Sequence, residues 1–479
     1  MSNLRLPSPR GAPRSRLGVL PLLVSVAAPA ALAVDLDASP AAPALFAEEI
    51  VASVAAPVAL ANVSNGLDLS TPLDYSFTQG EVRHARIACP GHVRFLAGSA
   101  VVPSDAPSTS IGAINGLGGA AITFSVTALT TGLTANDRLT VTGGREITET
   151  RDAECSFALY DTPSQASAGG PVGRIIERTG DYLDFSPSFV LRAETAGRAT
   201  ADANSGDGAY TRFVAEAPTN DPTLGQLGRL SYGTVQDVLG TPQPRAATGL
   251  PITLADLMDA DTALVVAGDF EAAANAFLST AANCSTVDFP ATVADSTSAR
   301  FPVGTAAALG VHLCYSASVG EVQPSDYAVS LEPVAASAAY SVASRGPEAL
   351  GSIVRNGTEL MAPLVQPAPG QIARIVLTNS GSEKRRFTLR MLSSAGGSPS
   401  EADSTYVGIT SSDGMIPENG SVVINIAEVF PVDRFQGPAR GAIRVIVSAP
   451  NSQIQGLYQI VNPARGTLSN HVMVRPGTN

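Results

Sequence analysis

The last third of the chain is built from short runs in which apolar and polar residues alternate. Phe387, Leu389 and Met391 alternate with polar residues, and the same pattern recurs in residues 422–426, 443–447 and 457–461. A period of two is typical of half-buried β-strands, and each run is bounded by Asn, Gly or Pro turn residues. Residues 336–479 are therefore predicted to form an antiparallel, immunoglobulin-like β-sandwich.

Two further β-rich blocks precede this sandwich. Alternating runs at residues 122–126 and 155–159 predict an N-terminal β-domain over residues 34–205, closed by the turn-rich residues 204–208. Residues 206–335 are predicted to form a middle β-rich domain with one or two short helices. One helix is expected to begin at the capping box Thr253–Asp256, and the other to cover the alanine-rich residues 271–278. The predicted fold class is mainly all-β, with tandem sandwich domains.

The N-terminal 33 residues have the pattern of a secretory signal peptide. Four arginines precede an apolar run over residues 17–32, and Ala31-Leu32-Ala33 supplies a cleavage pattern. The run is short for a bilayer span and contains two prolines, which argues against a membrane anchor. Cleavage after Ala33 removes four arginines and no acid, so the net charge changes from −12 to −16.

The four cysteines of an exported chain are expected to be oxidised. Pairing in sequence order, Cys89–Cys155 and Cys284–Cys314, keeps each bond within one predicted domain. A zinc site would need four ligands at tight spacing and no CxxC pair is present, so disulfides are favoured over a zinc site.

The sequence offers little support for an enzyme. The four histidines, His84, His92, His312 and His471, lie in no HExxH motif, and no GxSxG or Asp-Thr-Gly motif is present. Residues 116–121 match GxGxxA, but a predicted strand rather than a helix follows, which indicates a turn and not a dinucleotide site. We therefore predict no catalytic and no cofactor-binding residues.

Calcium is the one ion for which the sequence offers candidate ligands. Asp202, Asn204 and Asp207 lie in an acidic, glycine-containing segment. The segment departs from the EF-hand pattern, because Gly206 and Asp207 occupy its fifth and sixth positions and no glutamate stands at the twelfth. A plain Asx-type turn is the alternative, and a mature charge of −16 could also attract divalent cations diffusely. The same charge excludes nucleic acid as a partner.

Four stretches carry a resemblance to a known group of proteins. They are residues 75–87 (YSFTQGEVRHARI), 156–166 (SFALYDTPSQA), 453–463 (QIQGLYQIVNP) and 469–477 (SNHVMVRPG). In these patches the chain resembles secreted, β-rich surface-layer proteins of Gram-negative bacteria. The resemblance implies an exported protein that coats the cell surface through cation-dependent contacts.

Two functions follow as hypotheses. The first is a structural surface-layer or coat subunit that assembles with copies of itself and contacts the lipopolysaccharide of the cell envelope. The alternative is an adhesin or fimbria-like binding module, in which an exposed strand edge would receive a partner strand. Both place the chain outside the cytoplasm, on the cell surface or in the periplasm, and neither needs an integral membrane segment.

Overall fold

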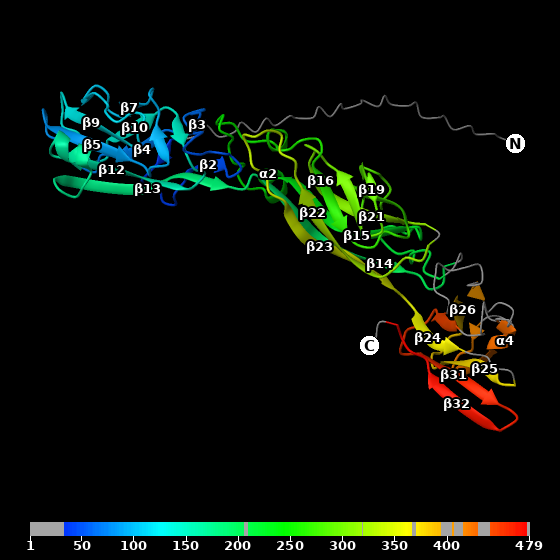
Figure 1. Ribbon diagram of the computed structural model, residues 1–479. Helices are drawn as coiled ribbons and strands as arrows, with labels where there is room; N and C mark the ends of the chain where they lie inside the picture. The colour runs from blue at the N-terminus through cyan, green and yellow to red at the C-terminus, as the bar shows by residue number, and fades with distance from the viewer. Residues whose placement is uncertain are drawn as a thin grey trace, which may run out of the picture.

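The computed structural model describes residues 33–205, 209–318, 320–365, 370–393, 405–406, 415–429 and 441–476. Strands dominate these ranges and the four helices within them are short, which confirms the predicted mainly β fold. Three β-domains follow one another along a curved rod (Figure 1). The predicted signal peptide lies outside the described residues except for Ala33. No helix in the described part of the chain is long and apolar enough to cross a membrane.

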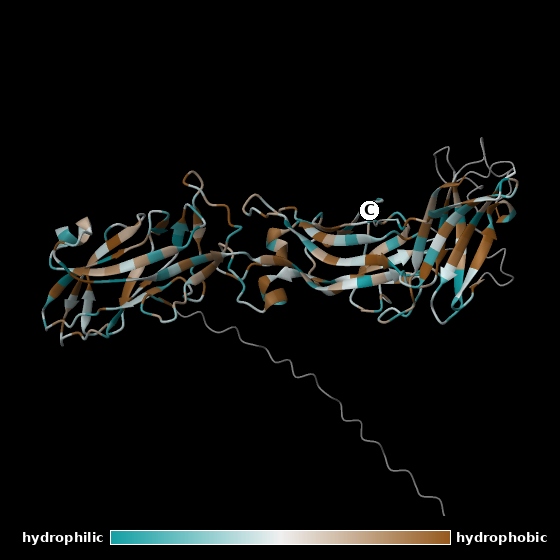
Figure 2. Cartoon of the chain, turned by 90° about the horizontal axis from the view of Figure 1, so that it is seen from below, coloured by the Kyte–Doolittle hydropathy of each residue, from teal (hydrophilic) through white to brown (hydrophobic). Residues whose placement is uncertain are grey.

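The N-terminal domain contains three sheets, ordered β1-β4-β10-β7, β3-β11-β6 and β2-β13-β12-β5-β9-β8. The run predicted at residues 122–126 lies in β9, where Ile122, Phe124 and Val126 are buried, and hydrophobic and hydrophilic residues alternate along the strands in Figure 2. The elements are β1 Val34–Asp35, β2 Ala44–Ala47, β3 Val58–Leu60, β4 Leu69–Pro72, β5 Val82–Ala88, β6 Val93–Phe95, β7 Ala100–Pro103, β8 Thr109–Ile111, β9 Ala121–Ala128, β10 Arg138–Thr142, β11 Arg145–Ile147, β12 Ala153–Tyr160, α1 Pro163–Ala168 and β13 Arg174–Ser186.

The middle domain is one ten-stranded sheet, ordered β18-β17-β21-β15-β14-β23-β22-β16-β20-β19. The sheet folds over on itself, because β17 and β18 near one end contact β20 near the other. The elements are β14 Phe189–Ala201, β15 Leu224–Thr234, α2 Val235–Leu239, α3 Leu254–Leu257, β16 Ala263–Ala267, β17 Ala273–Ser279, β18 Phe289–Pro290, β19 Val293–Ala294, β20 Ser298–Pro302, β21 Ala308–Ala317, β22 Ser325–Glu332 and β23 Arg345–Arg355.

The C-terminal domain is a sandwich of two sheets with its own hydrophobic core. One sheet has the order β24-β30-β26-β27 with β28 also paired to β26, and the other has the order β29-β25-β31-β32. The elements are β24 Thr358–Val365, β25 Ile372–Asn379, β26 Arg385–Ser393, β27 Thr405–Tyr406, β28 Met415–Ile416, β29 Gly420–Asn425, α4 Ile426–Val429, β30 Gly441–Val447, β31 Ile454–Asn462 and β32 Thr467–Val472.

One of the two helices predicted in the middle domain is present and the other is not. Thr253 caps α3 and forms the expected capping box with Asp256. The helix predicted over residues 271–278 is wrong, because this segment contains β17, which pairs with β18 and β21. The strand buries Phe277 and Leu278, and this tertiary burial outweighs the helix propensity of its alanines.

The strand pairings place the domain boundaries differently from the sequence expectation of 205/206 and 335/336. β14 belongs to the middle sheet, where it pairs with β15 and, in parallel, with β23. The N-terminal domain therefore ends at β13, and only Pro187 and Ser188 separate it from the middle domain. β23 also belongs to the middle sheet, so the second boundary falls at Asn356 and Gly357.

Both predicted disulfides are present, Cys89–Cys155 and Cys284–Cys314. The first lies within the N-terminal domain and the second within the middle domain, so neither bond crosses a domain boundary.

The first joint, between the N-terminal and middle domains, is made by backbone hydrogen bonds. Residues 45–51 lie between the two domains: Ala47 N donates to Arg245 O at 2.9 Å, and Val51 N donates to Ala339 O at 2.9 Å. The buried Glu49 carboxylate accepts from the backbone N of Ser188 at 3.0 Å and from its hydroxyl at 2.7 Å. One hydrophobic cluster continues through both domains.

The second joint, between the middle and C-terminal domains, is made by charged side chains. Glu321 of the middle domain accepts from Arg390 at 2.8 Å and from Arg444 at 2.7 Å, both on strands of the C-terminal domain. Arg444 also forms a bidentate pair with Glu359, at 2.7 and 2.8 Å. The guanidinium of Arg355, at the end of β23, lies 4.3 Å from the ring centre of Tyr210.

Glu49 makes the stability of the chain depend on pH. Burial raises the pKa of Glu49 above its ordinary value, so the folded chain binds this proton more tightly than the unfolded chain does. Stability from this group is therefore present at low pH and is lost as the pH rises through the raised pKa. We expect Glu49→Gln, which cannot titrate, to gain stability relative to the wild type as the pH rises from the ordinary glutamate range near 4.5 toward neutrality.

Calorimetric melting of both chains across this range checks the expectation. Glu216→Gln, which changes an exposed carboxylate of the middle domain, is the matched control and should show a much smaller change with pH. A melting difference between Glu49→Gln and wild type that stays constant over the range would contradict it.

Removal of the Glu321 carboxylate should loosen the second joint. In Glu321→Gln two arginines of the C-terminal domain lose their shared partner, at a cost of about 2–4 kcal/mol. The side chain of Glu321 is 18% exposed, which places this figure below the full cost of breaking a completely buried pair. Spin labels in the middle and C-terminal domains should then give a broader distance distribution. Glu332→Gln, which breaks a surface pair with Arg300 inside the middle domain, should leave the distribution unchanged.

Candidate functional site: a groove in the C-terminal sandwich

The residues predicted as calcium ligands lie beside the second joint. Asp202 Oδ1 accepts from the backbone N of Asn204 at 3.0 Å and from the side-chain amide of Asn356 at 3.0 Å. Asn356 Oδ1 in turn accepts from the backbone N of Ala203 at 2.7 Å. Asp202 and Asn204 therefore form an Asx-type turn that holds the connection between β23 and β24. Asp207 lies outside the described residues, so the calcium prediction itself remains untested.

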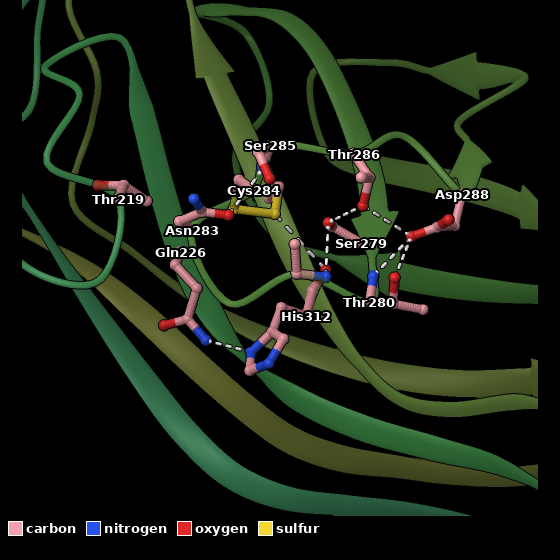
Figure 3. Close-up of a disulfide and its surroundings, with 12 residues drawn as sticks. Thr219, Gln226, Ser279, Thr280, Asn283, Cys284, Ser285, Thr286, Asp288 and His312 are labelled. Atoms are coloured by element: carbon pink, nitrogen blue, oxygen red, sulfur yellow. Dashed lines mark hydrogen bonds between the residues drawn. A yellow bond between two sulfur atoms is a disulfide. The ribbon is translucent and has the colours of Figure 1, made fainter. Parts of the chain in front are cut away.

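The histidines are dispersed over the molecule. His92 contacts the backbone O of Arg151 at 3.0 Å, and His312 contacts the side-chain amide of Gln226 at 2.7 Å. Figure 3 shows His312 near the Cys284–Cys314 disulfide, together with Asp288, which accepts from Thr280 and Thr286. Within the described ranges, no three His, Cys, Asp or Glu side chains lie close enough together to hold a metal ion.

An acidic pocket of about 490 Å³ lies on the N-terminal domain. It is lined by Asp152, Glu154, Asp181 and Asp184, at the start of β12 and the end of β13. Burial, followed by the hydrogen bond and charge of Asp152, raises the pKa of Asp184. This pocket adds to the acidic character of the domain, and its carboxylates belong to no metal-holding group in the part of the chain that the structure describes.

An apolar groove of about 470 Å³ lies on the C-terminal sandwich, between β24 of one sheet and β32 of the other. Tyr458 and Ile460 of β31 line it together with side chains from the two flanking segments. The groove residues are Ala362, Pro363, Leu364, Tyr458, Ile460, His471, Val472 and Val474. Three of them are large apolar side chains with high exposure, since Leu364 is 58%, Val472 80% and Val474 46% exposed.

β32 presents an open backbone edge beside this groove. It is the last strand in its sheet, and all six of its residues are exposed. Met473 N donates to Gly456 O of the preceding strand. Because successive N–H groups of a strand alternate in direction, those of Leu468, Asn470 and Val472 point away from β31.

The open edge ends where the two sheets meet. Val474 is bonded in both directions to Met361 of β24, at 2.7 and 2.9 Å. The backbone of β32 is therefore available for pairing only over the part that lies before this bridge, next to the exposed apolar side chains.

The C-terminal domain also differs in charge from the rest of the rod. Residues 34–186 and residues 187–357 each contain 17 acidic and 8 basic residues, a net charge of −9 per domain. Residues 358–479 contain 8 acidic and 10 basic residues, a net charge of +2. Residues 360–382 and 434–479, which include every groove residue, contain no Asp or Glu at all. The groove therefore favours a partner that carries negative charge.

This groove was not predicted from the sequence. The alternating residues of β31 and β32 indicate strands, but they do not reveal which strand becomes an edge. The absence of Asp and Glu from the last 46 residues was the one signal that could have singled out this end of the chain.

Comparisons with known proteins provide no family. No family model and no curated protein matches the sequence. One similar solved structure is a protein from Corynebacterium diphtheriae whose name describes it as membrane anchored, at 10% identity and a TM-score of 0.17, covering 91% of this chain and 89% of that one. Another is a serine-rich repeat protein from Streptococcus agalactiae, at 8% identity and a TM-score of 0.15, covering 83% and 82%. TM-scores this low support no argument about fold or function.

Proposed function

We propose that this chain is an exported structural protein of the cell surface of a Gram-negative bacterium, a surface-layer or coat subunit. The observation that carries the proposal is the pair of joints. Backbone hydrogen bonds fix the first joint and a cluster of arginines and carboxylates fixes the second. Three β-domains held in this way form a stiff rod of defined length, which is the property that a repeating coat requires of its subunit.

The expected compartment agrees with this role. The sequence begins with a signal-peptide pattern, and both disulfides would persist in an oxidising environment outside the cytoplasm. Each bond lies within one domain, so oxidation stabilises the domains and leaves the geometry of the rod to the joints.

The charge of the first two domains indicates how such subunits would pack. Two surfaces of net charge −9 repel each other when they approach within a Debye length of about 8 Å at physiological salt. Divalent cations, calcium above all, would reduce this repulsion. They would also bridge the carboxylates to the phosphates of lipopolysaccharide. In this proposal the cations act between molecules and need no dedicated cage within one chain.

An adhesin or fimbria-like module is the second candidate function. The apolar groove beside the open edge of β32 favours it, because an added strand could pair with β32 while its apolar side chains enter the groove. This function would require a ligand other than the chain itself.

Chelation of intact cells distinguishes the two candidates. We expect a wash with EDTA to release the chain into the supernatant, and electron microscopy to show the loss of a regular surface coat. A wash with EDTA and excess calcium is the control, and it should leave the coat in place. A chain that remains bound after chelation, on cells with a smooth surface, would contradict the coat function.

A further inference from the structure

In the part of the chain that the structure describes, no strand pairs with the open edge of β32, and the apolar groove adjoins this edge. Val472 is 80% exposed and Leu468 is 52% exposed. The two residues are four positions apart on β32, so their side chains lie on the same face of the strand. Natural proteins usually protect a strand edge with charges, prolines or a covering loop. The six residues of β32 include no Asp, Glu, Lys or Arg and no proline.

We propose that this surface binds a second copy of the same chain, through one of the acidic domains of that copy. The inference rests on the proposed coat function and deepens it, because it names the contact through which the subunits assemble. The C-terminal domain of one subunit would dock on the N-terminal or middle domain of the next, and the backbone edge of β32 would pair with a strand of that neighbour.

Charge complementarity selects this occupant. The segments that build the groove contain no acidic residue, whereas the other two domains of a neighbouring copy each carry a net charge of −9. Arg465 lies exposed in the turn between β31 and β32. Arg475 lies just beyond β32, where it binds the backbone O of Asn451 and of Ile454 at 2.8 Å each. A negatively charged neighbour would therefore meet only neutral and basic residues along this edge.

The same charges disfavour a symmetric pair of β32 strands. In an antiparallel pair centred on β32, each Arg465 would approach the region of Arg475 in the other copy, which places like charges together. A contact between different surfaces of the two copies avoids this repulsion. A symmetric contact ends at a dimer, whereas a contact between different surfaces leaves one surface of each kind open. Further copies can therefore be added, which produces an extended assembly.

Two substitutions on β32 test the contact. Asn470→Pro removes an N–H that points away from β31, and it leaves the donors of Ser469, His471 and Met473 in place. Val472→Glu replaces the most exposed apolar side chain of the edge by a negative charge, which an acidic neighbour would repel. Val423→Glu is the matched control, because Val423 is a 44% exposed valine on β29, the opposite edge of the same sheet.

Sedimentation velocity of the oxidised, exported chain measures the result at low and high salt, with and without calcium. We expect the wild type and Val423→Glu to form species larger than a dimer as the concentration rises, more strongly at low salt. Asn470→Pro and Val472→Glu should raise the dissociation constant about tenfold or more. Unchanged melting temperatures would show that both variants fold, and Val472→Glu decides the matter if Asn470→Pro does not fold.

Each other outcome overturns a different statement. Assembly of both folded β32 variants at wild-type strength overturns this contact and leaves the coat function standing. A wild type that stops at a dimer at all concentrations overturns the repeated contact in favour of a symmetric pair. A wild type that stays monomeric with calcium present overturns both the contact and the self-assembly of the coat, and the groove then belongs to a different partner.

Discussion

The organisation of this protein depends on how its chain passes from one domain to the next. β13 ends at Ser186 and β14 begins at Phe189, while β23 ends at Arg355 and β24 begins at Thr358. Each passage leaves two residues outside the strands, which is too short for a flexible linker. The direction of an extended strand therefore sets the direction of the following domain, and the three domains form a rod (Figure 1).

The two joints stabilise these passages by different means. At the first, the backbone of residues 45–51 bonds to both domains, and Glu49 supplies a buried acceptor to Ser188. At the second, Glu321 and Glu359 each pair with Arg355 of the middle domain and with Arg444 of the C-terminal domain. Asn356 also binds Asp202, which ties the connection to the turn there. Buried polar groups need hydrogen-bond partners in a specific geometry. Both joints therefore favour one orientation of the neighbouring domains over other orientations that would bury a similar apolar area. The described residues of the segment that was predicted to bind calcium therefore stabilise the second joint.

Much of the local structure was predictable from the sequence, and its assembly was not. The alternating runs identified β9, β12 and most strands of the C-terminal sandwich, because a period of two is typical of strands that are buried on one face. The helix expected at residues 271–278 is wrong because β18 and β21 pair with the two edges of this segment, and because Phe277 and Leu278 are buried. The boundaries failed because Asn204–Gly208 has turn chemistry inside a domain, whereas the real boundaries lie within almost continuous strands. The groove was missed because edge position is a property of the sheet.

The sequence by itself determined the pattern of strands, the pairing of the cysteines within blocks, and the separation of an acidic body from an acid-free C-terminal end. These properties depend on residue type and spacing along the chain. Only the tertiary structure decided that β23 returns to pair in parallel with β14, that Glu321 meets Arg390 and Arg444, and that β32 remains an open edge. Each of these depends on contacts between residues far apart in sequence, which local preferences do not encode.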